Sequence, residues 1–184
     1  MNILALDTGT FTGWCYRDAS GHIESGTQDF SLQRGESPGM RFLHFNRWLR
    51  ANWCGPLYPN PEAPHRNPAP QNLVNLVLYE QTHHRGGAAT HVGENLVGRV
   101  LEWCAAEGIE HKPCHTSTLK KAVTGNGHAS KEEMARAVAV RMPELDTYRE
   151  WTEHECDALC LLAWFDLGMP ESARKQRVKR EAKQ

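Results

Sequence analysis

The sequence lacks a long hydrophobic run, a paired-cysteine motif and an internal repeat. No apolar stretch approaches the ~18 residues that cross a bilayer, and the first residues lack the basic-then-apolar order of a signal peptide. The six cysteines show no CxxC spacing, so we expect reduced core residues and no disulfide framework. These absences predict an intracellular, cytoplasmic protein with no membrane partner.

The length and composition are typical of one globular domain. The chain has 184 residues, of which 40% are hydrophobic and 23% charged. The formal net charge of -1 does not by itself indicate a nucleic-acid binder. The average hides a basic end, however, because residues 174–183 carry six bases against one acid, a pattern that attracts phosphate. We therefore expect one domain over residues 1–170 and a basic tail over residues 171–184.

Hydrophobic periodicity and turn residues divide the domain into strands and helices. Short apolar runs bounded by turn residues predict strands at 2–7, 13–16, 23–30, 73–80 and 110–113. Helical spacing predicts helices at 38–52, 88–107, 116–124 and 130–142, the last of which opens on a capping box at 130–133. A second capping box at 152–155 opens a final helix, whose predicted core face is Ala158, Leu161, Leu162 and Phe165. Six prolines between 56 and 70 predict an extended surface loop. This order of elements predicts an α/β fold, a mixed five-stranded sheet with helices on both faces.

Acidic residues end two of the predicted strands and recur in the last helix. Asp7 ends the first strand and Glu80 the fourth, while His154 and Asp157 share one helix face at spacing i, i+3. A buried carboxylate is unfavourable unless something neutralises it, and a metal ion does so economically. Three carboxylates and one imidazole suit Mg²⁺ or Mn²⁺, and two such ions about 4 Å apart support phosphodiester hydrolysis. His111, Cys114 and His115 are an alternative zinc half-site, but no second half with the usual spacing follows.

Four segments spread over most of the chain form a more specific pattern. They are residues 7–13 (DTGTFTG), 78–81 (LYEQ), 119–131 (LKKAVTGNGHASK) and 154–159 (HECDAL). Together they resemble the RuvC family of Holliday-junction resolvases, within the ribonuclease H-like superfamily. The resemblance implies a RuvC-like nuclease domain over residues 1–170. It also implies a metal-dependent, structure-selective endonuclease that nicks four-way DNA junctions and leaves 5′-phosphate and 3′-hydroxyl ends.

The resemblance also assigns the metal ligands. Residues that match Asp7, Glu80, His154 and Asp157 hold two divalent metal ions in the family, and the ligand that matches His154 varies between histidine and aspartate. These four are therefore expected to be catalytic ligands of Mg²⁺ or Mn²⁺.

Basic residues and a partner follow from the same resemblance. It places Lys120 and Lys131 near the scissile phosphate and the DNA backbone, so we count Lys131 as catalytic and Lys120, Lys121 and Lys131 as DNA-binding. It further implies a symmetric homodimer, with one active site for each of two opposed strands of the branched DNA.

One loop departs from the family pattern. Some members carry an aromatic residue three positions after the strand-end glutamate, where this chain has His83, followed by His84 and Arg85. Histidine and arginine also stack on bases, so these three residues are predicted DNA contacts. The divergent loops fit a phage-encoded member of the family.

Other functions stay open at this point. The pattern Asp-x-Gly-Thr after a first strand also opens the sugar-kinase and actin-like ATPase fold, but 184 residues cannot form its two lobes. A non-catalytic junction-binding protein would not need the acids that this chain keeps. Among nucleases, the alternatives are a broader branched-DNA or flap endonuclease and an RNA-processing enzyme of the same superfamily.

Overall fold

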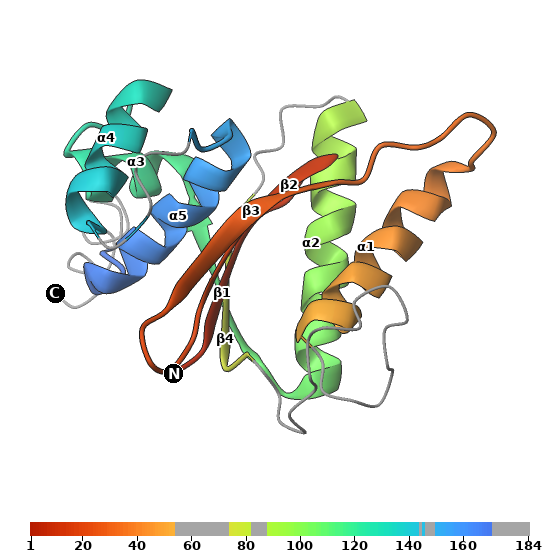
Figure 1. Ribbon diagram of the computed structural model, residues 1–184. Helices are drawn as coiled ribbons and strands as arrows, with labels where there is room; N and C mark the ends of the chain where they lie inside the picture. The colour runs from red at the N-terminus through yellow and green to blue at the C-terminus, as the bar shows by residue number, and fades with distance from the viewer. Residues whose placement is uncertain (54–73, 82–87, 144, 146–149, 171–184) are drawn as a thin grey trace, which may run out of the picture.

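The computed structural model describes residues 1–53, 74–81, 88–143, 145 and 150–170. Its centre is a five-stranded sheet with the order β3-β2-β1-β4-β5 (Figure 1). β1, β2 and β3 form an antiparallel meander, and β4 and β5 run parallel to β1. The strands are β1 (Ile3–Asp7), β2 (Phe11–Arg17), β3 (Ile23–Asp29), β4 (Leu76–Gln81) and β5 (Glu110–His115).

Helices cover both faces of this sheet, so the predicted α/β fold is confirmed (Figure 1). One face is covered by α1 and α2, and the other by α3, α4 and α5. The helices are α1 (Pro38–Trp53), α2 (Ala88–Glu107), α3 (Thr116–Thr124), α4 (Lys131–Arg141) and α5 (Glu153–Asp166). Among the described residues, none of the helices has the length and apolar character to cross a membrane.

Strand alternation divides the hydrophobic core into two clusters, one on each face of the sheet. In β1, Ile3 and Ala5 pack in the cluster beneath α5, whereas Leu4 and Leu6 pack in the cluster beneath α1 and α2. Successive side chains of a strand point to opposite faces. The next odd residue of β1, Asp7, therefore shares the α5 face, and strand alternation in β4 gives Glu80 the same face as Leu78.

The helix α5 is buried on almost every side, which the sequence pattern did not predict. The predicted core face, which included Ala158 and Phe165, is only part of the buried surface of the helix. Within that face Ala158 is buried and Phe165 is half-buried. Leu159, Cys160 and Trp164 are buried as well. The reason is that α5 lies between the sheet on one side and α3 and α4 on the other.

The predicted caps differ in how far they form. In α4 the predicted capping box is complete, because Ser130 accepts a hydrogen bond from the Glu133 N–H and the Glu133 carboxylate accepts one from the Ser130 N–H. In α5 the Thr152 hydroxyl accepts from the Glu155 N–H at 3.1 Å. The Glu155 carboxylate, expected to complete a second box, is buried and accepts a hydrogen bond from Ser25 of β3 at 2.7 Å.

The described cysteines agree with the prediction from the sequence, whereas the bounds of two strands differ from it. The five described cysteines are free and buried, as predicted, and Cys54 lies outside the described residues. β4 begins at Leu76, later than predicted, and β5 continues to His115, beyond the predicted end. The proline-rich segment 56–70 and the tail 171–184 also lie outside the described residues.

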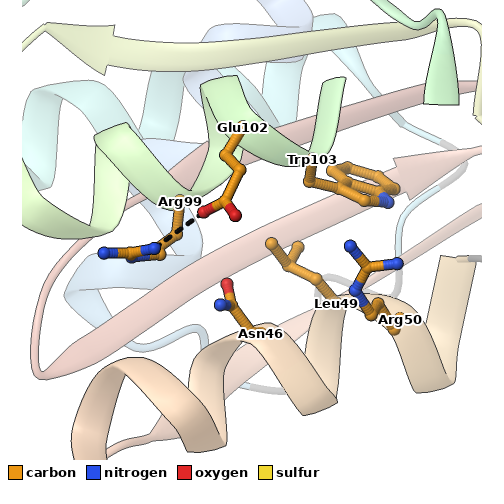
Figure 2. Close-up of a pocket in the computed structure, with 6 residues that line it drawn as sticks. All are labelled: Asn46, Leu49, Arg50, Arg99, Glu102 and Trp103. Carbon is orange, nitrogen blue, oxygen red and sulfur yellow. Dashed lines mark hydrogen bonds and ion pairs between the residues drawn. The ribbon is translucent and has the colours of Figure 1, made fainter. Parts of the chain in front are cut away.

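Figure 2 shows the packing between α1 and α2 on the face of the sheet away from α5. Leu49 and Trp103 are buried there, and Arg99 donates to Glu102 at 2.7 Å. The cavity at this contact is about 10 Å³, at the lower limit for a single water molecule. This face therefore serves packing, and the predicted metal ligands belong to the opposite face.

The close approach of β2 to α5 gives the first testable prediction. A Cβ atom added at Gly13 would lie 1.8 Å from the His154 carbonyl oxygen, a backbone atom that cannot move without shifting the helix. Gly13→Ala should therefore destabilise the protein by about 3 kcal/mol or more, as overpacking against backbone does. Gly98→Ala is the matched control, because nothing lies within 4 Å of a Cβ there. Urea denaturation should show Gly98→Ala to be neutral or stabilising by up to ~1 kcal/mol, and equal stability of the two variants would contradict the prediction.

Candidate active site

Asp7 and Glu80 are placed side by side by the register of two parallel strands. In β1 and β4, Leu4 pairs with Val77 and Leu6 with Tyr79, so the next residues along the strands are Asp7 and Glu80. Both lie at the carboxyl ends of parallel strands, which open toward the same edge of the sheet. Each is partly buried, beneath the start of α5.

The first turn of α5 is held against this edge by contacts with β2 and β3. Gly13 of β2 lies directly against the His154 backbone. The hydroxyls of Thr27 and Thr152 form a hydrogen bond, and Ser25 donates to the Glu155 carboxylate. These contacts fix the helix turn that carries His154 and Asp157.

His154 contacts Asp7 directly. Its Nδ1 lies 3.0 Å from the Asp7 Oδ2, and because a carboxylate only accepts, Nδ1 carries the proton. The hydrogen bond that His154 donates to Asp7 raises the pKa of His154, and the negative charges of Asp7 and Asp157 raise it further. Hydrogen bonding thus joins the last residue of β1 to the first turn of α5.

Burial and mutual repulsion raise the pKa of two carboxyls in this cluster. The pKa of Glu80 rises from 4.5 to about 7, mainly because of burial and further because of the charges of Asp7 and Asp157. The pKa of Asp157 rises from 3.8 to about 6, again mainly through burial and then through Asp7. The ionised forms of both carboxyls are therefore unfavourable in this partly buried cluster.

Asp7 and Asp157 lie within electrostatic range of both Glu80 and His154, and hydrogen bonds hold three of the four side chains. Glu80 accepts a hydrogen bond from the Thr116 hydroxyl at the start of α3, and Asp7 is bonded to His154. In the described part of the chain, no three histidine, cysteine or acidic side chains form a compact ligand group. The predicted metal ligands thus form a looser cluster than a compact ligand group. Carboxylate oxygens and an imidazole are nevertheless ligands that Mg²⁺ or Mn²⁺ accepts.

Two of the three predicted lysines lie near this cluster. Lys131, at the start of α4, forms an ion pair with Glu153, and its charge lowers the pKa of Asp157. Lys120 donates to the Ala129 carbonyl at 2.8 Å, and its charge lowers the pKa of Glu80. Lys121 is exposed in the last turn of α3.

The predicted base-contacting residues cannot be placed. His83, His84 and Arg85 lie outside the described residues.

A pocket of about 250 Å³ opens beside the cluster, between the starts of α4 and α5. Asp157 and Lys131 line it together with Met134 and Trp151. The site therefore has an open, partly apolar space directly next to one carboxylate.

Several residues of the site were not identified from the sequence. Thr116 was predicted only as a helix start, yet it is the donor to Glu80. Phe11 was not singled out, yet its ring stacks on His154 with centroids 6.1 Å apart and planes at 18°. Strand alternation back from Gly13 places Phe11 on the α5 face and is the one signal that could have identified it.

The sheet order, with acids at the carboxyl ends of the neighbouring parallel strands β1 and β4, defines a ribonuclease H-like fold. Two solved structures share it. The chain matches RuvC from Thermus thermophilus at a TM-score of 0.60 and 20% identity, over 92% of this chain and 98% of that one. It matches T. thermophilus RuvC in complex with a Holliday-junction substrate at a TM-score of 0.61 and 18% identity, over 92% and 97%. No protein-family model matches the chain, and no curated protein matches its sequence.

The raised pKa of Glu80 predicts how stability depends on pH without divalent ions. Folding raises this pKa from 4.5 to about 7, so the folded state holds more protons between these values. Stability should fall as the pH rises through this window, and the loss should be complete above pH 7. Glu80→Gln removes the charge and keeps an acceptor for Thr116. It should stabilise the metal-free protein at pH 8 by about 1 to 3 kcal/mol.

Thermal unfolding in EDTA from pH 4.5 to 8.5 tests this expectation. Glu110→Gln is the control, because Glu110 is an exposed residue at the far end of β5. Its melting profile should follow the wild type. A Glu80→Gln variant that is less stable than the wild type at pH 8 would show that the Glu80 charge is not unfavourable in the folded state.

Proposed function

We propose that this protein is a divalent-metal-dependent endonuclease that nicks branched DNA, and that it resolves four-way Holliday junctions by phosphodiester hydrolysis. The observation that supports this most is the cluster of Asp7, Glu80, His154 and Asp157, placed by β1, β4 and α5 at one edge of a ribonuclease H-like sheet. The likeness of the fold to RuvC, one structure of which holds a Holliday-junction substrate, adds to it.

In this proposal the four clustered side chains hold two Mg²⁺ or Mn²⁺ ions. Metal ions bound there would activate a water and stabilise the leaving oxygen, and the hydrolysis would leave 5′-phosphate and 3′-hydroxyl ends. His154 orients Asp7 through the hydrogen bond at 3.0 Å, and Thr116 orients Glu80. Partial burial leaves the carboxylates poorly hydrated, so a cation replaces less water than it would at an exposed acid.

Lysines supply the charge that a phosphodiester needs. Lys131 and Lys120 act on the pKa of Asp157, so their positive charges lie near the cluster. We assign Lys131 to the scissile phosphate, where exchange of its Glu153 partner for phosphate keeps it paired. Lys120, Lys121, His83, His84 and Arg85 are assigned to the flanking DNA.

The proposed assembly is a homodimer, because resolving a four-way junction takes two nicks in opposed strands.

Cleavage of labelled four-way, three-way, flap and linear DNA, and of a structured RNA, tests which substrate the protein prefers. Preference for the four-way junction supports the proposal. Equal cutting of flaps or three-way DNA would make the protein a broader branched-DNA endonuclease, and cutting of RNA alone would make it an RNA-processing enzyme.

Loss of a metal ligand should separate cutting from binding. Asp7→Asn and Glu80→Gln should each reduce junction cleavage by about 1,000-fold or more, the scale seen when one member of a catalytic unit is removed. DNA affinity should stay the same or increase, because each change removes a charge that repels phosphate. Glu110→Gln is again the control and should cut normally. Normal cleavage by Asp7→Asn at saturating Mg²⁺ or Mn²⁺ would refute the assignment.

His154 should make the reaction sensitive to acid in a metal-specific way. Its pKa is raised by Asp7, so protons compete with metal at this ligand until the pH exceeds that raised value. His154→Asp should keep metal-dependent cleavage, shift the preference from Mn²⁺ toward Mg²⁺, and lose part of the acid-side decline. His154→Ala should be severely impaired. Rates in each metal from pH 5.5 to 8.5 measure this, and wild-type rates for His154→Ala would remove His154 from the ligand set.

A further inference from the structure

We propose that Phe11 is a stacking platform for a nucleobase of the cleaved strand, next to the candidate active site. This inference rests on the proposed function, since it names how that site holds its DNA. It assigns a binding role to a residue that is neither acidic nor basic.

The exposure of Phe11 is unusual in this molecule. Its side chain is 45% exposed, and it is the one exposed Phe, Tyr or Trp side chain among the described residues. The other described Phe, Trp and Tyr side chains are buried or half-buried in the two core clusters or against them. Packing therefore accounts for the other aromatic residues, and it leaves much of the Phe11 ring facing solvent.

The position of Phe11 explains why no helix covers it. Phe11, Gly13, Cys15 and Arg17 occupy alternate positions of β2 and so share the α5 face. Gly13 lies under His154, Cys15 is in the core beneath α5, and Arg17 pairs with Asp166 in the last turn of α5. Because α5 begins over Gly13, Phe11 lies just beyond the start of the helix, at the edge where Asp7 and Glu80 lie.

The ring is held in a defined place there. It stacks on the His154 imidazole with centroids 6.1 Å apart and planes at 18°, and His154 is itself bonded to Asp7. The turn before Phe11 is closed by the buried Thr12, whose hydroxyl donates to the Gly9 carbonyl at 2.8 Å. A base on the exposed side of the ring would continue the stack from His154 through Phe11 to the DNA.

The charge of the site favours a base as the occupant. In the metal-free site Asp7 and Asp157 repel phosphate, so an ionic hold on the strand is weak there until a metal ion binds. Stacking on a neutral ring does not suffer this repulsion and accepts any base. We therefore assign to Phe11 the nucleotide that flanks the scissile phosphate, and sequence-independent contact with it.

A double-mutant cycle, in which Phe11→Ala is combined with removal of one DNA base, tests whether Phe11 contacts that base. The cleavage position is first mapped with the wild type, and four-way junctions are then made with an abasic nucleotide on either side of that position. Binding is measured in EDTA, where metal plays no part, for the wild type and Phe11→Ala. On intact DNA, Phe11→Ala should bind about 5- to 100-fold more weakly, the cost of losing one stacked base. On the abasic junction that lacks the stacked base, the two proteins should bind equally.

Matched variants and a spectroscopic signal sharpen the test. Phe11→Trp should restore binding, because it keeps a flat ring. Leu43→Ala should have no effect, because Leu43 is similarly exposed, at 41%, but belongs to α1 on the other face of the sheet. A 2-aminopurine at the flanking position should be quenched by the wild type and not by Phe11→Ala.

The outcomes distinguish this inference from the proposed function. Suppose that the wild type cuts junctions, but the loss of affinity caused by Phe11→Ala is the same on abasic as on intact DNA. The stacking platform is then refuted and the proposed function stands. If Phe11→Ala alters only the metal dependence of cleavage, with EDTA binding unchanged, Phe11 merely positions His154 and the platform is refuted as well. If the wild type neither binds nor cuts branched DNA, the proposed function itself has failed.

Discussion

The close contact between β2 and the first turn of α5 is the constraint on which the rest of the structure depends. Only a residue without a Cβ allows the His154 carbonyl to lie against the strand at Gly13. That approach lowers α5 onto the sheet, so that almost all of the helix is buried between the sheet and α3 and α4. It also brings His154 and Asp157 to the edge where β1 and β4 end.

The free-energy cost of this arrangement comes mainly from the partly buried carboxylates. Burial raises the pKa of Glu80 to about 7 and that of Asp157 to about 6, so the ionised site opposes folding at neutral pH. Hydrogen bonds from His154 and Thr116 offset part of this cost. Groups held in an unfavourable charge state, at one edge of an otherwise apolar face, are typical of a functional site.

The two faces of the sheet have separate roles. Beneath α1 and α2, aromatic residues such as Phe45 and Trp48 pack against one another, and polar groups pair at the surface. Beneath α5, small and sulfur-containing residues such as Ala5, Cys15 and Cys160 allow the helix to pack closely along the sheet. Both faces thus bury an apolar core, and the face beneath α5 also positions the acids.

The sequence by itself determined the elements and the candidate ligands. Apolar runs located the strands that Asp7 and Glu80 end, and the spacing of His154 and Asp157 on one helix was a local property. The capping box of α4 was equally local, since its partners are three residues apart. Resemblance to RuvC then suggested the fold that the structure shows.

Only the tertiary structure decided which groups meet. The hydrogen bond between Asp7 and His154 spans 147 residues and that between Ser25 and Glu155 spans 130 residues, so neither leaves a periodic signal. Glu155 shows that a distant contact can replace a local one. Its carboxylate was expected to cap α5, but it accepts a hydrogen bond from Ser25 of β3. Phe11 is exposed because it lies beyond the start of α5, which begins over Gly13. Local sequence sets the conformation of each segment, whereas burial and pairing between distant segments set the contents of the site.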